Sequence, residues 1–296
     1  MIDKLEMFIA LARNRHFGRA AEECGVTQPT LSAAIKQLEE QLGVMLVWRG
    51  SRYRGLTPEG ARVLEWARQI VGDARTMREE MRAVKQGLSG KLRLAVIPTA
   101  LAMVSGLTTP LSARHPNLKF TVLSRTSAEI LQLLENLEID AGITYLDNEP
   151  LGRVTTVPLF AEHYNLVTRA DTPLSDRQSV TWAEVAALPL CLLTPDMQNR
   201  RIINRHMAQA GAQVAPRLES NSVITLTSHV LTGDWATILP LQTAEFFLAS
   251  GALSAVPIVA PEAAHLVGLV APHREPHTPV LDALLTAARR LGGPSA

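Results

Sequence analysis

Residues 17–42 read F-G-R-A-A-E-E-C-G-V-T-Q-P-T-L-S-A-A-I-K-Q-L-E-E-Q-L, and this stretch decides how the whole chain is interpreted. Gly25 supplies the backbone freedom that ends a first helix. Thr27 is placed to cap a second helix, and Pro29 fits its first turn. One face of the second helix is apolar, at spacings of four, three and four: Leu31, Ile35, Leu38 and Leu42.

The opposite face of this second helix carries short polar or basic groups: Gln28, Thr30, Ser32, Ala33 and Lys36. Such groups can approach a base edge in a major groove. The pattern therefore predicts a helix-turn-helix with an exposed recognition helix. The alternative is a pair of core helices whose outer face is merely polar.

The residues that follow favour the DNA-binding interpretation. Residues 42–58 read as strand, turn and strand, with the turn at residues 50–51. Between Met45 and Thr57 the charged residues are all basic: Arg49, Arg52 and Arg54. A β-wing with arginine near its tip can reach into the minor groove. The alternative is a surface hairpin with solvated arginines.

A long helix is predicted over residues 58–86, because Thr57 and Pro58 begin it and no strong break occurs before Gly87. Its apolar residues alternate at spacings of four and three: Val63, Ala67, Ile70, Ala74, Met77, Met81 and Val84. This heptad seam predicts pairing with the same helix of a second copy. The alternative packs the seam on its own domain. Residues 87–90 form a short joint.

From residue 91 the pattern changes to alternating strands and helices, which predicts a mostly parallel sheet in two α/β lobes. Expected strands span 92–97, 119–123, 139–144 and 163–168, and a strand at 265–270 returns to the first lobe. Ligands in such sheets bind at strand carboxyl ends and helix N-termini.

Hydroxyl groups gather at these positions, and with helix N-terminal amides they favour a small anion such as a carboxylate. The alternative role for each is helix capping. The residues are Thr99, Ser124, Thr126, Ser127, Thr144, Tyr145 and Thr194.

Bulk properties narrow the class of protein. The 296 residues are enough for about two domains, and the net charge of +1 makes the local basic segment more informative than the total. Neither a signal peptide nor a membrane span is apparent. Cys24 and Cys191 lie far apart, which favours a reduced cytosolic protein without a metal site. Catalytic motifs are missing, so we expect no enzyme and no cofactor.

Taken together, the chain resembles a LysR-type transcriptional regulator along its whole length. The resemblance rests on residues 17–43, on L-V-W-R-G-S-R-Y-R-G-L-T-P-E-G at 46–60 and on L-E-I-D-A-G-I at 137–143. A fourth motif, V-L-T-G-D-W-A-T-I-L-P at 230–240, resembles a turn in the family's second lobe. Three departures from the family pattern are Cys24, Val47 and Trp235, the last of which puts bulk near the hinge of the second lobe.

The resemblance implies an α/β protein with a helix-rich N-terminal part. It implies a winged helix-turn-helix at 1–57, a linker and dimerisation helix at 58–90, and a periplasmic-binding-protein-like effector domain at 91–296. Lobe I of this domain would span 91–160 and 266–296, and lobe II 161–265.

The implied function is that of a bacterial, cytoplasmic regulator that binds double-stranded operator DNA as a homotetramer and responds to a small-molecule co-inducer. Contact with RNA polymerase is compatible with this role. The competing interpretation is a cytosolic solute-binding protein whose N-terminal module serves only oligomerisation.

The resemblance also carries over site residues by position. Those matched to bases are Gln28, Pro29 and Ser32, and those matched to phosphates or groove edges are Thr27, Thr30 and Lys36. Arg52 matches the wing arginine, and the basic Arg49 is expected beside it. The positions matched to effector contacts are Thr99, Ser127, Tyr145 and Thr194.

Overall fold

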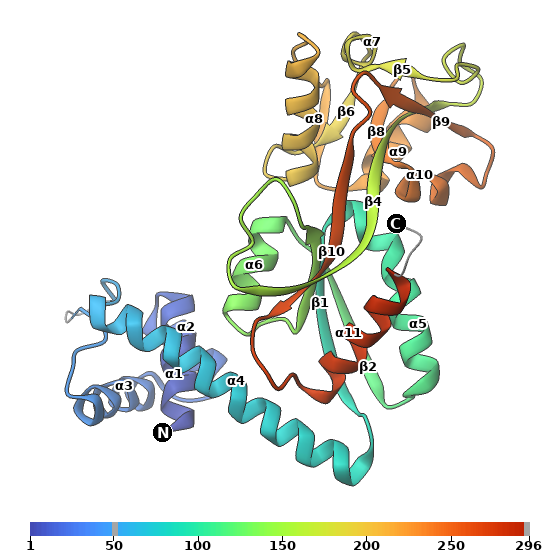
Figure 1. Ribbon diagram of the computed structural model, residues 1–296. Coiled ribbons are helices and arrows are strands. Elements are labelled where there is room, and N and C mark those ends of the chain that lie inside the picture. Colours follow the sequence, from blue (N-terminus) through green and yellow to red (C-terminus); the bar gives the residue numbers. More distant parts are fainter. Residues whose placement is uncertain (49–52, 293–296) are drawn as a thin grey trace. The chain divides into compact units, whose positions relative to one another are not determined.

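The computed structural model describes residues 1–48 and 53–292, and these fall into two compact units. Unit 1 comprises Met1–Leu88 with Glu135–Glu138 and Arg274–Pro279, and unit 2 comprises Ser89–Leu134, Ile139–His273 and Val280–Ala296. The amino-terminal part is helical, whereas the remainder mixes helices and strands (Figure 1).

Unit 1 is built on α1 (Ile2–Asn14), α2 (Phe17–Glu23) and α3 (Gln28–Leu42). Their apolar faces meet in one core, which includes Leu5, Phe8, Leu11, Ala20, Leu31, Ile35 and Leu38. The small Ala20 is fully buried, which allows α2 to approach its neighbours closely. Leu42, expected on the buried face of α3, is instead 41% exposed, because α3 ends there and the chain turns away at Gly43.

The turn between α2 and α3 has the geometry that the sequence predicts. Gly25 has a φ of +66°, its N–H donates to Glu22 O at 3.1 Å, and the Val26 N–H donates to Ala21 O at 2.9 Å. This pair of bonds ends α2 in a Schellman motif. The Thr27 hydroxyl then accepts the Thr30 N–H at 3.4 Å and caps α3.

Helix α4 (Pro58–Gln86) follows Thr57, whose side chain forms two hydrogen bonds. The Thr57 hydroxyl accepts the Gly60 N–H at 2.9 Å and donates to Met45 O at 2.5 Å. This side chain caps α4 and joins it to the segment after α3. The helix ends before Gly87, as expected.

The predicted seam of α4 is divided between two environments. Ala67 is fully buried in the core of unit 1, and Val63 packs against that core. Further along, Ala74 is also buried, but the larger apolar side chains are exposed, and together with Trp66 they form a stripe: Trp66, Ile70, Met77, Met81 and Val84. The start of the seam thus packs on its own domain, and the exposed stripe is the part free to pair within the described structure.

The base of the predicted wing lies within the described residues. Val47 and Leu56 form an antiparallel bridge, and the Trp48 N–H donates to Gly55 O at 3.1 Å. The expected turn at residues 50–51, with Arg49 and Arg52, lies outside the described part of the chain.

Unit 2 contains an eight-stranded sheet with the order β2-β1-β3-β10-β4-β9-β5, and β8 also pairs with β4. Strand β1 (Gly90–Val96) is parallel to β2 (Leu118–Ser124) and β3 (Ala141–Tyr145). Strand β10 (Ala264–Pro272) returns from late in the chain and is antiparallel to β3. The sheet is therefore mixed: the expectation of parallel pairing holds around β1 and between β9 and β5, whereas β10 pairs antiparallel with β3 and β4, and β4 pairs antiparallel with β8 and β9.

Strand β4 (Val154–Arg169) connects two groups of strands. Residues 154–163 pair with β10, whereas residues 164–169 pair with β8 (Thr237–Pro240) and β9 (Leu253–Val259). We call lobe I the part built on β1, β2, β3, β10 and the first portion of β4. Lobe II is the part built on the last portion of β4 with β8 and β9.

Helices and short strands complete both lobes (Figure 1). Lobe I contains η1 (Pro98–Val104), α5 (Ser105–Arg114), α6 (Ser127–Glu135) and α11 (Pro279–Leu291). Lobe II contains β5 (Val180–Thr181), α7 (Trp182–Ala186), β6 (Cys191–Leu193), α8 (Gln198–Gln209), β7 (Leu218–Ser220), α9 (Val223–Thr232) and α10 (Leu241–Leu248). Among the described helices, none combines the length and the apolar character that crossing a membrane requires.

The close approach of α4 to the segment after α3 yields a test. A Cβ atom at position 60 would overlap the Leu46 carbonyl group, which belongs to the backbone and cannot rotate away. We expect Gly60→Ala to lower the free energy of unfolding of unit 1 by about 1–3 kcal/mol through overpacking. Thermal unfolding of the full chain, followed by helical circular dichroism, measures the effect.

Gly106→Ala is the matched control, because a Cβ there meets its nearest neighbour, Leu291, at 3.9 Å. This change should be neutral or stabilise by up to about 1 kcal/mol through helix propensity. Equal effects of the two substitutions would contradict the close approach.

Candidate functional site

The first candidate site is the outer face of α3. Its predicted contact residues are all exposed: Thr27, Gln28, Pro29, Thr30, Ser32 and Lys36. The opposite face is fixed by Leu31, Ile35 and Leu38, which are buried. A helix held by one apolar face, with short side chains on the other, has the form of a helix that can enter a major groove.

A buried carboxylate holds the segment after α3, and no sequence pattern indicated it. Glu39 Oε1 accepts the Leu46 N–H at 2.7 Å and the Val47 N–H at 3.3 Å. Glu39 therefore fixes the start of the wing relative to α3. Glu39 follows Leu38 within a polar run and lies off the Leu31–Ile35–Leu38 spacing. From the sequence pattern alone it would be taken for a surface residue.

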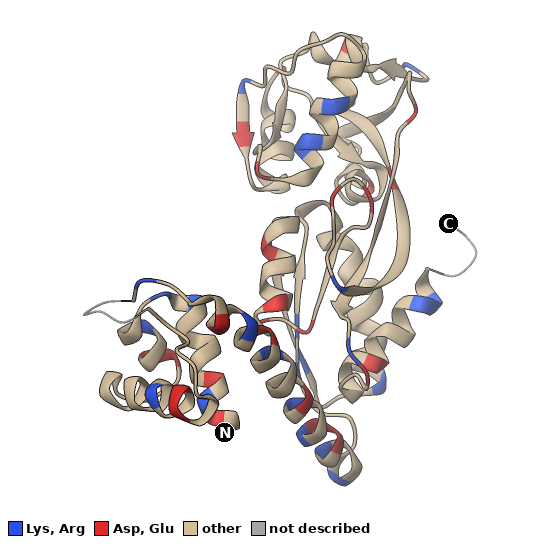
Figure 2. Ribbon diagram, turned by 60° about the vertical axis from the view of Figure 1, so that its left-hand side comes forward, with Lys and Arg blue, Asp and Glu red and all other residues tan. Residues whose placement is uncertain are grey.

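The basic groups near α3 are loosely held. Lys36 forms an ion pair with Glu40 at 3.8 Å, and both side chains are largely exposed. Such a pair contributes little stability, so Lys36 is available to a phosphate. Figure 2 shows that acidic residues are interspersed among the basic residues of α4.

The second candidate site lies in unit 2, where the predicted hydroxyl groups divide into one that caps a helix and several that have no hydrogen-bond partner. Thr126 caps α6, because its hydroxyl accepts the Glu129 N–H at 3.2 Å while Glu129 accepts the Thr126 N–H at 2.8 Å. The neighbouring Ser127 hydroxyl is buried and has no hydrogen-bond partner. The hydroxyls of Thr99, Thr144 and Thr194 are likewise unpartnered among the described residues.

Tyr145, at the end of β3, belongs to a buried hydrogen-bonded group. Its hydroxyl donates to Glu162 Oε2 at 2.5 Å and accepts from Asn199 Nδ2 at 3.2 Å. Thr99 lies beside this group, since its hydroxyl influences the pKa of Glu162. Ser127 and Thr194 form no hydrogen bond with it. The structure thus brings Tyr145 and Thr99 together, and adds Glu162 and Asn199.

Glu162 is fully buried on β4, and burial raises the pKa of its carboxyl group to about 7. The Tyr145 and Thr99 hydroxyls lower this pKa, and the charge of Asp147 raises it. The carboxyl oxygen Oε1 has no hydrogen-bond partner. Near neutral pH this group is therefore present in both protonation states.

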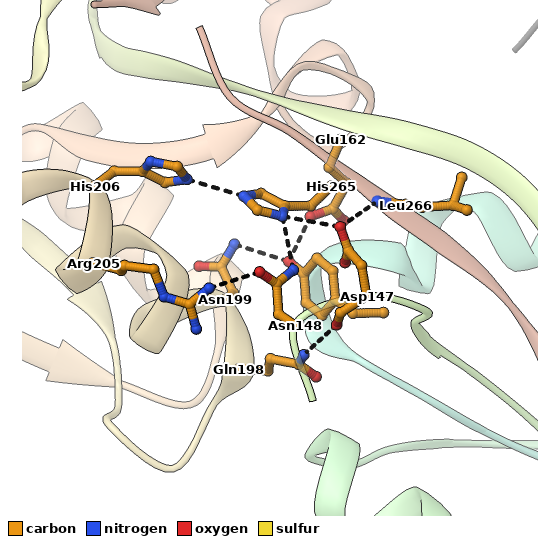
Figure 3. Close-up of polar contacts among 10 residues, drawn as sticks. Asp147, Asn148, Glu162, Gln198, Asn199, Arg205, His206, His265 and Leu266 are labelled. Carbon is orange, nitrogen blue, oxygen red and sulfur yellow. Dashed lines mark hydrogen bonds and ion pairs between the residues drawn. The ribbon is translucent and has the colours of Figure 1, made fainter. Parts of the chain in front are cut away.

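A second polar chain runs beside the first (Figure 3). Asp147 Oδ2 lies 3.2 Å from His265 Nδ1, and His265 Nε2 lies 2.9 Å from His206 Nε2. The His206 ring stacks on Trp182, with centroids 5.0 Å apart. Glu162 and His265 are direct partners in the antiparallel register of β4 and β10, so the two chains adjoin.

The sequence did not identify Glu162, Asp147, Asn199, His206 or His265 as site residues. The signal available was a charged residue on the inward face of a strand, since Glu162 alternates with the buried Tyr164 and Leu166. The histidines are 59 positions apart, and only the folded chain brings them together.

Neither cysteine belongs to this group. Cys191 is fully buried in β6, and burial raises the pKa of its thiol to about 11. Cys24 is half-buried at the end of α2, and burial raises its pKa as well. Within residues 1–48 and 53–292, no group of three or more His, Cys, Asp or Glu is arranged to hold a metal ion.

Comparison with known proteins gives two family matches. The model for the bacterial regulatory helix-turn-helix protein of the lysR family matches residues 2–61. The model for the LysR substrate binding domain matches residues 85–292.

Individual relatives agree with these matches. The DNA-binding transcriptional dual regulator OxyR of Escherichia coli K12 is 31% identical over 270 residues, covering 91% of this chain and 88% of that protein. The hydrogen peroxide-inducible genes activator of Pectobacterium carotovorum is 30% identical, and the aligned region covers 91% of this chain and 89% of that protein.

Solved structures give the same result. A cysteine-to-aspartate variant of full-length OxyR from Pseudomonas aeruginosa superposes with a TM-score of 0.76 at 27% identity, covering 98% of this chain and 94% of that one. CbnR, a LysR family regulator, shares the fold at 20% identity with a TM-score of 0.61 and covers 99% of each chain.

The buried carboxyl group generates a stability test. Because the pKa of Glu162 is about 7 in the folded chain and ordinarily 4.5, the folded state holds a proton that the unfolded state releases. Stability should fall as pH rises from about 4.5 to about 7 and then level off. Glu162→Gln removes this loss, so at pH 8 the variant should be more stable by up to about 3 kcal/mol.

Thermal unfolding of both proteins between pH 4.5 and 8.5 measures this difference, which should shrink toward zero at the acidic end. Glu262→Gln is the control, because Glu262 is 76% exposed and should give no pH-dependent difference. A variant less stable than the wild type at pH 8 would contradict the assignment.

Proposed function

On the premise that the chain belongs to the LysR family of bacterial transcriptional regulators, we propose that helix α3 reads the operator and that the junction between the lobes receives the effector. The protein is a DNA-binding regulator with an effector-binding domain. The observation that carries the DNA part of the proposal is the division of α3 into a buried apolar face and an exposed polar face.

The proposed DNA contacts keep their predicted roles. Gln28, Pro29 and Ser32 lie on the exposed first turns of α3, where base edges are reached. Thr27, Thr30 and Lys36 are exposed at the same helix and suit phosphates or groove edges. Arg49 and Arg52 are assigned to the wing from the sequence alone.

We infer that two copies of the chain form a homodimer through α4. Two such dimers would make the tetramer that the family resemblance implies. The exposed stripe that begins at Trp66 and ends at Val84 supports this inference, because large exposed apolar surfaces mark interaction sites. A dimer presents two recognition helices to two half-sites. The proposed limits remain 1–57 for the DNA-binding domain, 58–90 for the linker and 91–296 for the effector domain.

The proposed effector is a small anion. The unpartnered hydroxyls of Thr99, Ser127 and Thr194 support this class, because each can donate one hydrogen bond. Glu162 is compatible with an anion while its carboxyl group is protonated, since the acid can then donate as well. We further propose a cytoplasmic, non-catalytic protein; the match of residues 2–61 to a regulatory DNA-binding family disfavours a mere solute-binding role.

Several curated relatives are named hydrogen peroxide-inducible genes activators, but the chemistry of this chain argues for a different signal. Peroxide attacks thiolates, and with a pKa of about 11 only about one Cys191 thiol in ten thousand is ionised at pH 7. The Tyr145–Glu162–Asn199 group contains no sulfur. We therefore propose that the effector binds without covalent chemistry.

The assignment of α3 is tested with Ser32→Arg. A long cationic side chain at this exposed position should abolish the specific footprint on DNA that flanks the gene, while binding to random DNA persists. Gln41→Arg introduces the same charge at an exposed position near the other end of α3 and should leave the footprint intact. Identical footprints for wild type and Ser32→Arg would refute the assignment.

Peroxide treatment tests the noncovalent effector. We expect a severalfold molar excess of hydrogen peroxide to leave both thiols titratable and the operator affinity within about twofold, because neither thiol is appreciably ionised. The peroxide-inducible relative from Escherichia coli serves as the positive control. A change in affinity that disappears in Cys191→Ala or Cys24→Ser would overturn the proposal.

A further inference from the structure

Helix α8 of lobe II contacts the loop that follows β3 of lobe I through one of its faces. The Gln198 side chain donates to Asp147 O at 3.1 Å, and Arg205 donates to Asn148 Oδ1 at 2.8 Å. Between them, Arg201 donates to both carboxylate oxygens of Glu149, at 2.8 and 2.9 Å. We call this set the α8 contact.

Two polar chains, buried except at Asp147, end on the same helix (Figure 3). One runs from Glu162 through the Tyr145 hydroxyl to Asn199, and the other runs from Asp147 through His265 to His206. Asn199 and His206 are seven positions apart, which places them two turns apart on one face of α8. The α8 contact is therefore continuous with a group of buried titratable side chains.

The two histidines share one Nε2 proton, and two arrangements of the remaining protons fit the contacts. His265 Nδ1 lies 3.2 Å from Asp147 Oδ2 and 2.8 Å from Asn148 Nδ2, so it either donates to Asp147 or accepts from Asn148. When it donates to Asp147, His265 Nε2 accepts the His206 Nε2–H, and His206 Nδ1 carries a lone pair. That nitrogen is buried without a hydrogen-bond partner, so in this arrangement a further proton would have to enter a buried position.

The surroundings of His206 oppose this proton. Burial lowers the pKa of His206, the neighbouring His265 and Arg205 lower it further, and Gln209 on the same helix raises it. The other elements packed against the ring present Trp182 from α7 and Tyr164 from β4. His206 is therefore neutral in the observed arrangement at pH 7.

Burial raises the pKa of Glu162, whereas it lowers the pKa of His206. Its carboxyl group faces Tyr145 from β3, Thr99 from η1, Tyr164 from its own strand and His265 from β10. The charge of Asp147 acts on it unfavourably, and the Arg201 and Arg205 side chains are engaged with Glu149 and Asn148 instead. Loss of its proton would place a second negative charge in this buried group.

We propose that the α8 contact is proton-dependent: it forms when Glu162 is protonated and His206 is neutral, and it loosens when either group changes its protonation state. The two lobes are then held together most firmly on the acidic side of pH 7, where Glu162 is protonated and His206 has not yet gained a proton. In the regulator proposed above, on which this consequence rests, pH would alter the response to the effector.

Hydrogen exchange of the full-length protein between pH 5.0 and 8.5 tests the inference, with rates corrected for the intrinsic pH dependence. We expect protection of amides in α8 to be greatest on the acidic side of pH 7, before Glu162 ionises, and to fall at least about tenfold toward pH 8.5 and toward pH 5.0. Glu162→Gln should remove the alkaline decrease, with its midpoint near pH 7. His206→Gln should remove the acidic decrease, whose midpoint lies below the ordinary histidine pKa of about 6.5.

Matched controls lie next to these positions in the chain or in space. His163→Gln changes an exposed histidine on β4, and Glu262→Gln changes its exposed partner. Both variants should keep the two decreases. Asp147→Asn provides a second test of the acidic side, because removing its charge should make His206 harder to protonate and move that decrease to lower pH.

Protection of α8 that stays constant across the range, or that changes equally in wild type, Glu162→Gln and His206→Gln, would overturn the inference. Footprinting at pH 7 separates this result from a failure of the proposed function. A wild-type protein that footprints its operator but shows constant protection refutes only the proton dependence. A protein without a footprint refutes the regulator assignment of α3 whatever its exchange pattern.

Discussion

Strand β4 divides its backbone hydrogen bonds between two sets of partners, and the structure of unit 2 depends on this division. Nine of its first ten residues pair with β10, Leu159 being skipped at a bulge, and its last six pair with β8 and β9. A backbone that satisfies both sets cannot be displaced from either lobe without leaving buried amides unpaired. The lobes are therefore joined by a continuous strand, and the side chains at the change of partners are forced into the interior.

Glu162 and Tyr164 stand at that change of partners, which explains why a carboxyl group is buried there. Burial of an ionisable group opposes its charged form, so the position itself determines the acidity of Glu162. The antiparallel register then places His265 opposite Glu162, and the carboxyl end of β3 supplies Tyr145 and Asp147. Topology, rather than any local motif, thus assembles the polar group between the lobes.

The parts of the fold that local periodicity determines could be predicted from the sequence. The buried face of α3, the turn at Gly25 and the start of α4 at Thr57 all follow from spacing and capping. The mixed sheet could not be predicted, because β10 and β3 are separated by more than a hundred residues. Residues 163–168 were recognisable as a strand, but its extension to Val154 depends on pairing with β10. For the same reason the sequence identified Tyr145 and Thr99 but not their partners.

The hydrogen bonds of Thr57 have a consequence for the geometry of DNA recognition. This side chain links the first turn of α4 to the Met45 carbonyl group, while Glu39 ties α3 to Leu46 and Val47. Helix α3 and the start of α4 consequently behave as one rigid body. In the proposed dimer, the angle at which two copies of α4 cross would fix the positions of the two α3 helices around the axis of the DNA duplex. Half-sites moved apart by about five base pairs would then face opposite sides of the duplex.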